Sequence, residues 1–193
     1  MARVSTSPLV KTYTLEEFWE LPDPPDRSKL ELIAGVLYMT PPPGPLHNNT
    51  VSRLLVLFHD YLRESGDKGR LYVPRAGIMK GPNSWLEPDL FYVAAGTQTL
   101  LDPTYPQYMT TADLVIEVIS PGSAIYDRNT KADTYAALGV KELWLIDEAL
   151  RLIEVRVLKG DRFAPSIVLE SDEQMRSEVL PGFVIKVAQI FDD

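Results

Sequence analysis

The stretch from Asp113 to Ile119 most constrains what this chain can fold into, because it places a carboxylate inside an apolar strand. Alternate side chains of a strand point to opposite faces, and here apolar residues occupy both faces. That pattern is typical of a central strand buried on both sides, so Glu117 stands where an aliphatic side chain is usual. Carboxylates are rarely buried without a partner, because removing the ion from water is costly. Glu117 therefore needs a structural or a chemical explanation.

Two further charged residues are expected to point inward beside this strand. Asp89 lies on the strand predicted for residues 86–94, on a face that is otherwise apolar. After a Ser-Pro-Gly-Ser break, the spacing predicts a helix over about 124–138 with Lys131 and Tyr135 on the side that meets the sheet. The pattern thus gathers two carboxylates and one amine around the central strand.

The rest of the chain indicates an α/β fold in one domain. A strand, a helix and another strand in this order predict a right-handed parallel crossover from 113–119 to 141–147. Thr14 and Glu17 predict a capping box at the start of a short helix. The other predicted elements are a hairpin within 29–40, a helix over 46–65, neighbouring strands over 70–80 and 86–94, an antiparallel pair over 151–158 and 164–170, and a strand over 183–187. Residues 1–12 are expected to form a loose leader and 95–112 a long loop that covers a site.

Composition excludes several classes of function. At 193 residues the chain can bury one sizeable core, and its net charge of −8 argues against tight binding of nucleic acid through overall charge. A nuclease remains compatible with that charge, since metal-binding carboxylates add negative charge that a cation later offsets. The absence of cysteine excludes disulfides, thiolate zinc sites and cysteine nucleophiles. No apolar run approaches the ~20 residues that span a bilayer, and the N-terminus lacks the apolar core of a signal peptide, so we expect a cytoplasmic protein without membrane association.

Several motifs, in this order, resemble the Uma2 family of restriction-endonuclease-like PD-(D/E)XK nucleases. They are KLELIAGVLYM, the Pro-rich loop with His47, EPDLFYV, DLVIEVISPGS, the helix with Asp127 and Lys131, GVKELWLID and LPGFVIKV. The resemblance implies a mixed β-sheet core flanked by helices, with an N-terminal hairpin and additional C-terminal strands, in a single domain over residues 1–193. One position departs from the superfamily pattern, because Ile119 stands where a lysine usually follows the glutamate. The resemblance implies that Lys131 on the following helix replaces it.

The resemblance also implies a metal-dependent endonuclease that hydrolyses DNA phosphodiester bonds. Asp89, Glu117 and the backbone carbonyl of Val118 are expected to hold Mg²⁺ or Mn²⁺, a hard cation that takes one or two protein carboxylates besides water and substrate oxygens. Glu31, a third carboxylate in an apolar setting, is expected to bind through water or to hold a second metal.

Two contacts, a substrate and an oligomeric state follow from the same resemblance, and the residues themselves add local positive charge. Lys131 would orient or deprotonate the attacking water, and His47 at the edge of the site would contact a phosphate. DNA is the expected substrate, and a homodimer is expected because superfamily nucleases often pair to cut two strands. Local positive charge for a DNA groove is expected at Lys68, Arg70, Arg75, Lys80 and Arg128.

Each assignment has a structural alternative. Asp89 would merely end a strand with a turn-type hydrogen bond, and Glu117 would form a buried salt bridge with Lys131. Lys131 would instead be a surface lysine paired with Asp127. Glu31 would be solvated on an edge hairpin. His47 would be a polar residue at a helix start, and Tyr135 and Trp144 core aromatics.

Two alternative functions remain open for the whole chain. The first is a catalytically degenerate nuclease fold that serves as a binding or assembly module, which the acidic pI and the displaced lysine favour. The second is a hydrolase of small phosphate esters, which a narrow pocket under residues 95–112 would favour, whereas an open groove would favour DNA.

Overall fold

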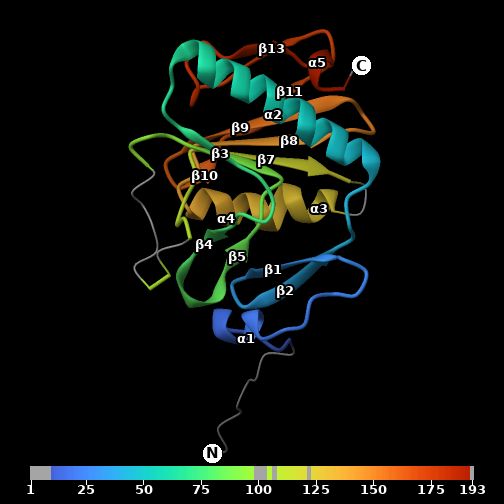
Figure 1. The fold of residues 1–193 in the computed structure, drawn as a ribbon, viewed down its shortest axis with the longest axis vertical. Helices are drawn as coiled ribbons and strands as arrows, with labels where there is room; N and C mark the ends of the chain where they lie inside the picture. Colours follow the sequence, from blue (N-terminus) through green and yellow to red (C-terminus); the bar gives the residue numbers. More distant parts are fainter. Residues whose placement is uncertain (1–9, 98–103, 106–107, 121–122, 192–193) are drawn as a thin grey trace, which may run out of the picture. The chain divides into compact units, whose positions relative to one another are not determined.

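The computed structural model describes residues 10–97, 104–105, 108–120 and 123–191 (Figure 1). The chain divides into two compact units, the first of Met1–Pro42 and Lys80–Leu86 and the second of Pro43–Met79 and Glu87–Asp193. A single domain over residues 1–193 stays a prediction. Of the expected leader, residues 1–9 lie outside the described residues.

The first unit is built on a hairpin, as the sequence predicts. β1 (Lys29–Ile33) pairs antiparallel with β2 (Val36–Thr40), and β5 (Trp85–Leu86) joins β1 on its other side, after the 3₁₀ turn η1 (Gly81–Asn83). α1 (Leu15–Trp19) begins at the predicted capping box, in which the Thr14 hydroxyl accepts from the Glu17 N–H and the Glu17 carboxylate accepts from the Thr14 N–H.

The second unit contains a mixed sheet in the order β10-β9-β8-β7-β6-β3, with β11 also paired to β9. β7 and β8 run parallel, as predicted, and the other pairs are antiparallel. The strands are β3 (Arg70–Tyr72), β6 (Leu90–Val93), β7 (Leu114–Ile119), β8 (Glu142–Asp147), β9 (Leu152–Lys159), β10 (Arg162–Phe163) and β11 (Ile167–Leu169). Every residue of β7 is buried, as expected for a central strand.

The two faces of this sheet carry different side chains. One face forms the apolar core, where alternate residues of the central strands pack with Leu54 and Phe58 of α2 (Pro45–Ser65). The opposite face carries Glu117 and is covered by α3 (Ala124–Tyr126), the π-helical turn η2 (Asp127–Lys131) and α4 (Ala132–Ala137) (Figure 1). The helix predicted over 124–138 therefore exists, but a π-turn interrupts it at the residues that carry Asp127 and Lys131.

Three other segments differ in detail from the predictions. Of the strand expected over 86–94, only β6 (Leu90–Val93) belongs to the mixed sheet, because Leu86 is part of β5. The strand expected over 70–80 is wrong in its extent: β3 ends at Tyr72 and β4 (Ile78–Met79) is separate, although β3 does pair with β6. The expected closing strand is β13 (Val184–Lys186), whose partner β12 (Gln174–Arg176) was not predicted, and α5 (Ala188–Phe191) follows it. Of the expected covering loop, residues 98–103 and 106–107 lie outside the described residues. Within the described ranges, no helix has the length and apolar character to cross a membrane.

Candidate functional site

Glu117 lies at the centre of the candidate site, on the face of β7 that meets the helical segment. The residue is 2% exposed. Lys131 Nζ donates to Glu117 Oε1 over 3.0 Å, and the Tyr135 hydroxyl donates to the same oxygen over 2.5 Å. The structure therefore brings together Glu117 and Lys131, as expected, and adds Tyr135, which the sequence pattern predicts only as a core aromatic.

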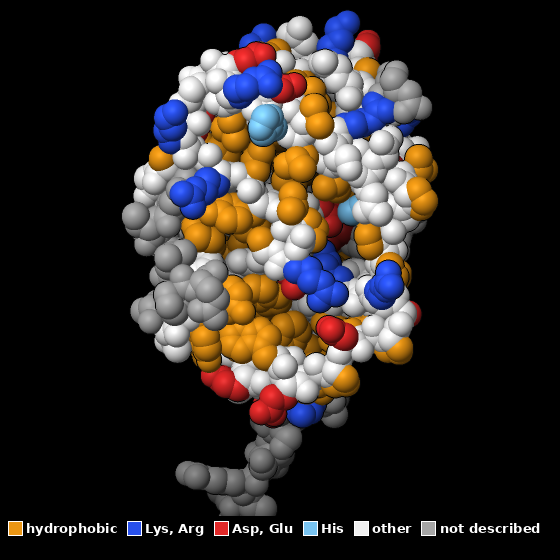
Figure 2. Space-filling view, viewed as in Figure 1, with side chains coloured by type: hydrophobic (Ala, Val, Ile, Leu, Met, Phe, Trp, Pro, Cys, Tyr) orange, Lys and Arg blue, Asp and Glu red, His pale blue; other side chains and the backbone are white. Residues whose placement is uncertain are grey.

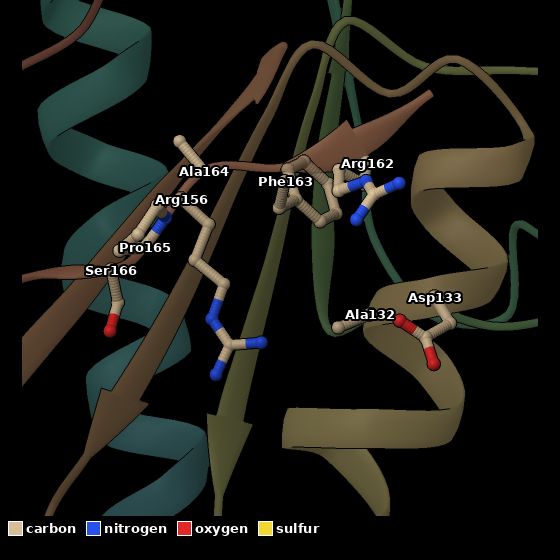
Figure 3. Close-up of a pocket in the computed structure, with 8 residues that line it drawn as sticks. All are labelled: Ala132, Asp133, Arg156, Arg162, Phe163, Ala164, Pro165 and Ser166. Atoms are coloured by element: carbon tan, nitrogen blue, oxygen red, sulfur yellow. The ribbon is translucent and has the colours of Figure 1, made fainter. Parts of the chain in front are cut away.

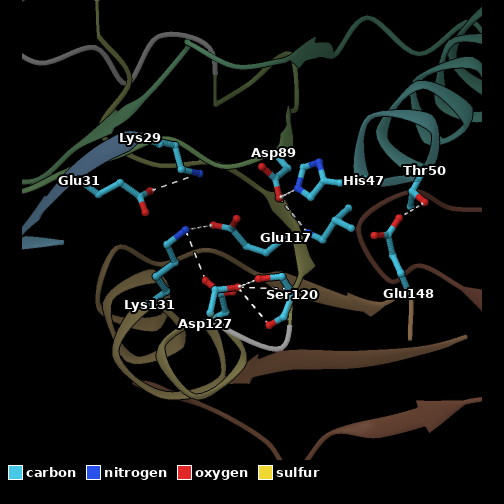
Figure 4. A network of polar contacts seen from close by, with 12 residues as sticks. Lys29, Glu31, His47, Thr50, Asp89, Glu117, Ser120, Asp127, Lys131 and Glu148 are labelled. Carbon is cyan, nitrogen blue, oxygen red and sulfur yellow. Dashed lines mark hydrogen bonds and ion pairs between the residues drawn. The ribbon is translucent and has the colours of Figure 1, made fainter. Parts of the chain in front are cut away.

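Lys131 is a buried cation held by several groups. It is 1% exposed, so the alternative of a surface lysine is wrong. Asp127 Oδ1 lies 3.5 Å from Lys131 Nζ (Figure 4). The ring centroid of Tyr126 lies 5.5 Å from the same nitrogen. An ammonium this deep is tolerated only when paired, because its desolvation is costly. Two carboxylates and an aromatic face provide that pairing.

Asp89 lies directly before β6 and contacts the strand of Glu117. The register of β6 on β7 pairs Leu90 with Ile116, which places Asp89 beside Glu117. Asp89 Oδ2 accepts from the Val118 N–H over 2.9 Å and lies 3.0 Å from His47 Nε2 at the start of α2 (Figure 4). His47 is thus a partner of a candidate metal ligand, and its expected phosphate contact stays a prediction.

Glu31 belongs to the first unit. It is 1% exposed on β1, so the solvated alternative is wrong, and Lys29 Nζ lies 3.9 Å from its Oε1. Its role as a metal ligand stays a prediction, as does that of the Val118 carbonyl.

The two carboxylates from neighbouring strands fit a hard divalent cation in their chemistry. Oxygen donors suit Mg²⁺ or Mn²⁺, and Mg²⁺ habitually takes few protein ligands. The hydrogen bonds on Asp89 Oδ2 and Glu117 Oε1 fix the orientation of both carboxylates, which is what groups around metal ligands usually do. In the part of the chain that the structure describes, no three acidic or histidine side chains are grouped to hold a metal.

A second charge cluster joins the π-turn to β8 and β9, and the sequence analysis identified only Arg128 among its members. Arg128 Nε donates to Glu154 Oε1 over 2.6 Å, and Nη2 donates to Asp147 Oδ2 over 3.1 Å. Burial lowers the pKa of the Arg128 guanidinium, but the hydrogen bonds that Arg128 donates to the Glu154 and Asp147 carboxylates outweigh this effect, and the net pKa is raised. Arg128 is half-buried in this cluster, and its expected contribution to the positive charge of a DNA groove stays a prediction. The alternation of side chains along β9 is a signal that could have identified Glu154. It places Glu154 and Arg156 on the face of the sheet that carries Glu117.

Most of the basic residues expected to line a DNA groove are exposed, and the groove itself stays a prediction. Lys68, Arg70 and Arg75 are exposed in the second unit, and Lys80 is exposed in the first. Figure 2 shows the Lys and Arg side chains of the described residues in several separate groups among apolar ones on the face in view.

A pocket of about 530 Å³ opens beside α4, lined by Ala132, Asp133, Arg156, Arg162, Phe163, Ala164, Pro165 and Ser166 (Figure 3). None of these belongs to residues 95–112 or to the candidate site, so the pocket does not support hydrolysis of a small ester there.

Comparison with known proteins agrees with the geometry. The model of the family Uma2, described as "Putative restriction endonuclease", matches residues 15–188. The crystal structure of "a putative nuclease belonging to DUF820" from Anabaena variabilis resembles the chain with a TM-score of 0.75 and 18% identity, covering 93% of this chain and 97% of that one. No curated protein matches. At this identity the structural likeness concerns the fold, and it confirms the predicted nuclease-like α/β fold.

Proposed function

We propose, from the premise that this chain belongs to the Uma2 family of restriction-endonuclease-like proteins, that it is a metal-dependent endonuclease that hydrolyses DNA phosphodiester bonds. The observation that carries the proposal is the contact of Lys131 Nζ with Glu117 Oε1 at 3.0 Å, on a strand whose next residue binds Asp89. A buried amine beside two carboxylates on neighbouring strands matches the residue types that phosphodiester hydrolysis requires.

Asp89 and Glu117 would hold the metal, helped by the Val118 carbonyl. A bound Mg²⁺ or Mn²⁺ supplies an activated water and offsets charge on the phosphoryl oxygens. Asp89 is held for this task by the Val118 N–H and by His47, and Glu117 by Tyr135. These bonds limit how far either carboxylate must move to bind, which lowers the entropic cost of binding.

Lys131 would orient the attacking water and stabilise phosphoryl charge. Its contacts with Asp127 and the Tyr126 ring hold the amine beside Glu117. DNA is the proposed substrate, with exposed Lys68, Arg70 and Arg75 available to phosphates. His47 as a phosphate contact, Glu31 as a second ligand and a homodimer that cuts two strands belong to the same proposal.

The test compares wild type with an Asp89→Asn/Glu117→Gln double variant. These changes keep shape and an accepting oxygen for Lys131, whereas alanine would leave that buried cation uncompensated. Mn²⁺ is titrated by calorimetry, and plasmid and single-stranded DNA are then incubated with Mg²⁺ or Mn²⁺. We expect saturable binding and nicking in wild type, and the loss of both in the folded double variant. Glu64→Gln, at an exposed carboxylate of α2, is the matched control and should behave as wild type.

One observation favours the alternative of a binding or assembly module. Glu117 and Lys131 already form a buried ion pair, and such a pair can serve structure alone. If wild type binds no Mn²⁺ while both proteins are folded, the metal site is refuted and the module becomes the better proposal. Binding of Mn²⁺ without cleavage of either DNA would refute the proposed substrate and keep the metal site.

A further inference from the structure

The π-turn between α3 and α4 has an unusual backbone contact at Arg128. In an α-helix the Arg128 carbonyl would accept from the Ala132 N–H, but that N–H donates to the Asn129 carbonyl instead. A donor reaches the Arg128 carbonyl from another element: Arg156 Nη1 on β9, at 2.7 Å. The guanidinium of Arg156 thus binds the backbone of the turn directly.

The side chain of Arg128 is held by the same strands. Its Nε and Nη2 bind Glu154 and Asp147, and the second oxygen of Glu154 accepts from Arg156 Nη2 over 3.2 Å. Glu154 therefore bridges the two guanidinium groups. One residue of the turn is fixed through its backbone and its side chain at once.

The other end of the turn carries Lys131, and the sheet register relates the two ends. Glu117 pairs with Leu145, and Leu145 pairs with Glu154, so both carboxylates lie in one row across the sheet with a single strand between them. Arg128 reaches the carboxylate at one end of this row and Lys131 the carboxylate at the other. A π-turn is wider than an α-turn, so it separates side chains three residues apart by a larger angle. That separation lets Lys131 reach Glu117 on β7 while Arg128 reaches Glu154 on β9.

We propose that Arg156 and Glu154 are positioning residues that hold the π-turn in the form that presents Lys131 to Glu117. Both act through Arg128 and contact none of the groups proposed to meet metal or substrate. The inference rests on the proposed function for its catalytic meaning, but the placement of Lys131 can be measured without any activity.

The experiment measures how fast the Lys131 amine is methylated by formaldehyde and a mild hydride donor in the folded protein, followed by mass spectrometry. A buried amine reacts only when the surrounding segment opens, so the rate reports the local opening equilibrium. Arg156→Met keeps the aliphatic stem and removes the donors. We expect Lys131 to react about fivefold faster in this variant, because one net hydrogen bond is lost from the closed state.

Three variants control the result. Arg162→Met makes the same change at an arginine that is 85% exposed and lines the pocket beside α4 together with Arg156 (Figure 3). It should leave the methylation rate of Lys131 unchanged. Glu142→Gln destabilises the protein at the start of β8, at the opposite end of that strand from Asp147, which contacts Arg128. This variant therefore shows how much of the methylation of Lys131 comes from global unfolding rather than from local opening of the π-turn. Arg156→Lys keeps one cationic donor but lacks the planar fork, and should react at a rate between those of wild type and Arg156→Met.

Each outcome decides the proposal. Unchanged methylation of Lys131 in folded Arg156→Met overturns it, and so does an equal rise in Glu142→Gln. If Arg156→Met does not fold, Arg156→Lys decides, and a wild-type rate there overturns the proposal.

The methylation experiment tests this proposal independently of the proposed nuclease activity. If wild type fails to bind Mn²⁺ or to cleave DNA, the methylation rates still test the turn. If it cleaves, Arg156→Met should lower kcat while the Kd for Mn²⁺ stays unchanged, since Asp89 and Glu117 are intact.

Discussion

Glu117 Oε1 accepts two donors, the Lys131 ammonium and the Tyr135 hydroxyl, in a setting with almost no access to water. Hydrogen bonds to a charged acceptor are about twice as strong as neutral ones. Tyr135 is 0% exposed, so its hydroxyl donates to Glu117 in a setting shielded from water. The phenol therefore shares with Lys131 the task of stabilising a buried carboxylate.

Tyr135→Phe removes this hydroxyl and keeps the ring. We expect the free energy of unfolding to fall by about 2 kcal/mol, because a charged acceptor loses a donor. Urea unfolding followed by fluorescence measures the change. Tyr61→Phe is the control, since its hydroxyl donates to the Pro181 carbonyl at an exposed position. Its loss should stay below about 1 kcal/mol, and equal losses in the two variants would contradict a special role for Tyr135.

For single residues, the sequence identifies site candidates only where a charged side chain interrupts an apolar pattern. Glu117 and Lys131 stand out because charge is unusual at inward positions, and the structure brings them together. Tyr135 fits an apolar stripe equally well as packing or as a donor, so its contact with Glu117 could not be predicted. His47 and Asp89 are 42 residues apart in the chain, and only the tertiary fold shows that they meet.

The helix over Lys131 shows what local spacing can and cannot specify for an element. Apolar spacing predicts a helix and the side that meets the sheet, and both are observed. The π-turn could not be predicted, because its contact at the Arg128 carbonyl comes from Arg156 on a strand that follows later in the chain. The β7–β8 crossover was predictable because the order strand, helix, strand permits few connections.

Glu142 at the start of β8 fixes the segment that leads into β13. One of its oxygens accepts from the Ser177 hydroxyl and from the N–H groups of Glu178 and Val179, and the other accepts from Trp144 Nε1. Glu142 is 0% exposed, and an amide in its place can accept at one end only. The C-terminal segment therefore depends on this carboxylate.

Glu142→Gln should lower the free energy of unfolding by about 2 kcal/mol, since part-buried donors lose a charged acceptor. Hydrogen exchange should quicken at residues 177–180 before the rest of the sheet. Glu178→Gln makes the same change where both partners of the ion pair with Lys159 are exposed, and should cost less than about 1 kcal/mol. Uniform exchange across the sheet would show that Glu142 does not hold this segment.

For the whole molecule, the positions of the charged groups say more about possible binding partners than the net charge does. The value of −8 includes buried carboxylates that are already neutralised, such as Asp113 with Lys141 and Glu117 with Lys131. Composition could exclude thiol chemistry, but it could not show the division into two units, which follows from contacts between distant segments.

Global stability at high pH should depend on Tyr92, a buried residue of β6 whose hydroxyl donates to Asp67 Oδ1 over 2.9 Å. Burial, together with Asp67, raises the pKa of the Tyr92 phenol well above its usual value of 10.0. Above pH 10 the unfolded chain releases this proton while the folded protein keeps it, so the unfolded state binds fewer protons. Stability from this group is therefore complete below pH 10 and is lost as pH rises further.

Tyr92→Phe lacks the titrating proton and keeps the ring that packs against Gly69, where no side chain would fit. Below pH 10 the variant should be less stable than wild type by about 1.5–3 kcal/mol, the net value of one hydrogen bond to a charged group. Between about pH 9 and pH 11 the difference between the two proteins should shrink by about 1.4 kcal/mol, which is one pKa unit of linkage. Urea unfolding at both pH values measures it, and the other tyrosines and lysines cancel because both proteins carry them. A difference that stays constant would show that the phenol of Tyr92 ionises alike in the folded and unfolded chains.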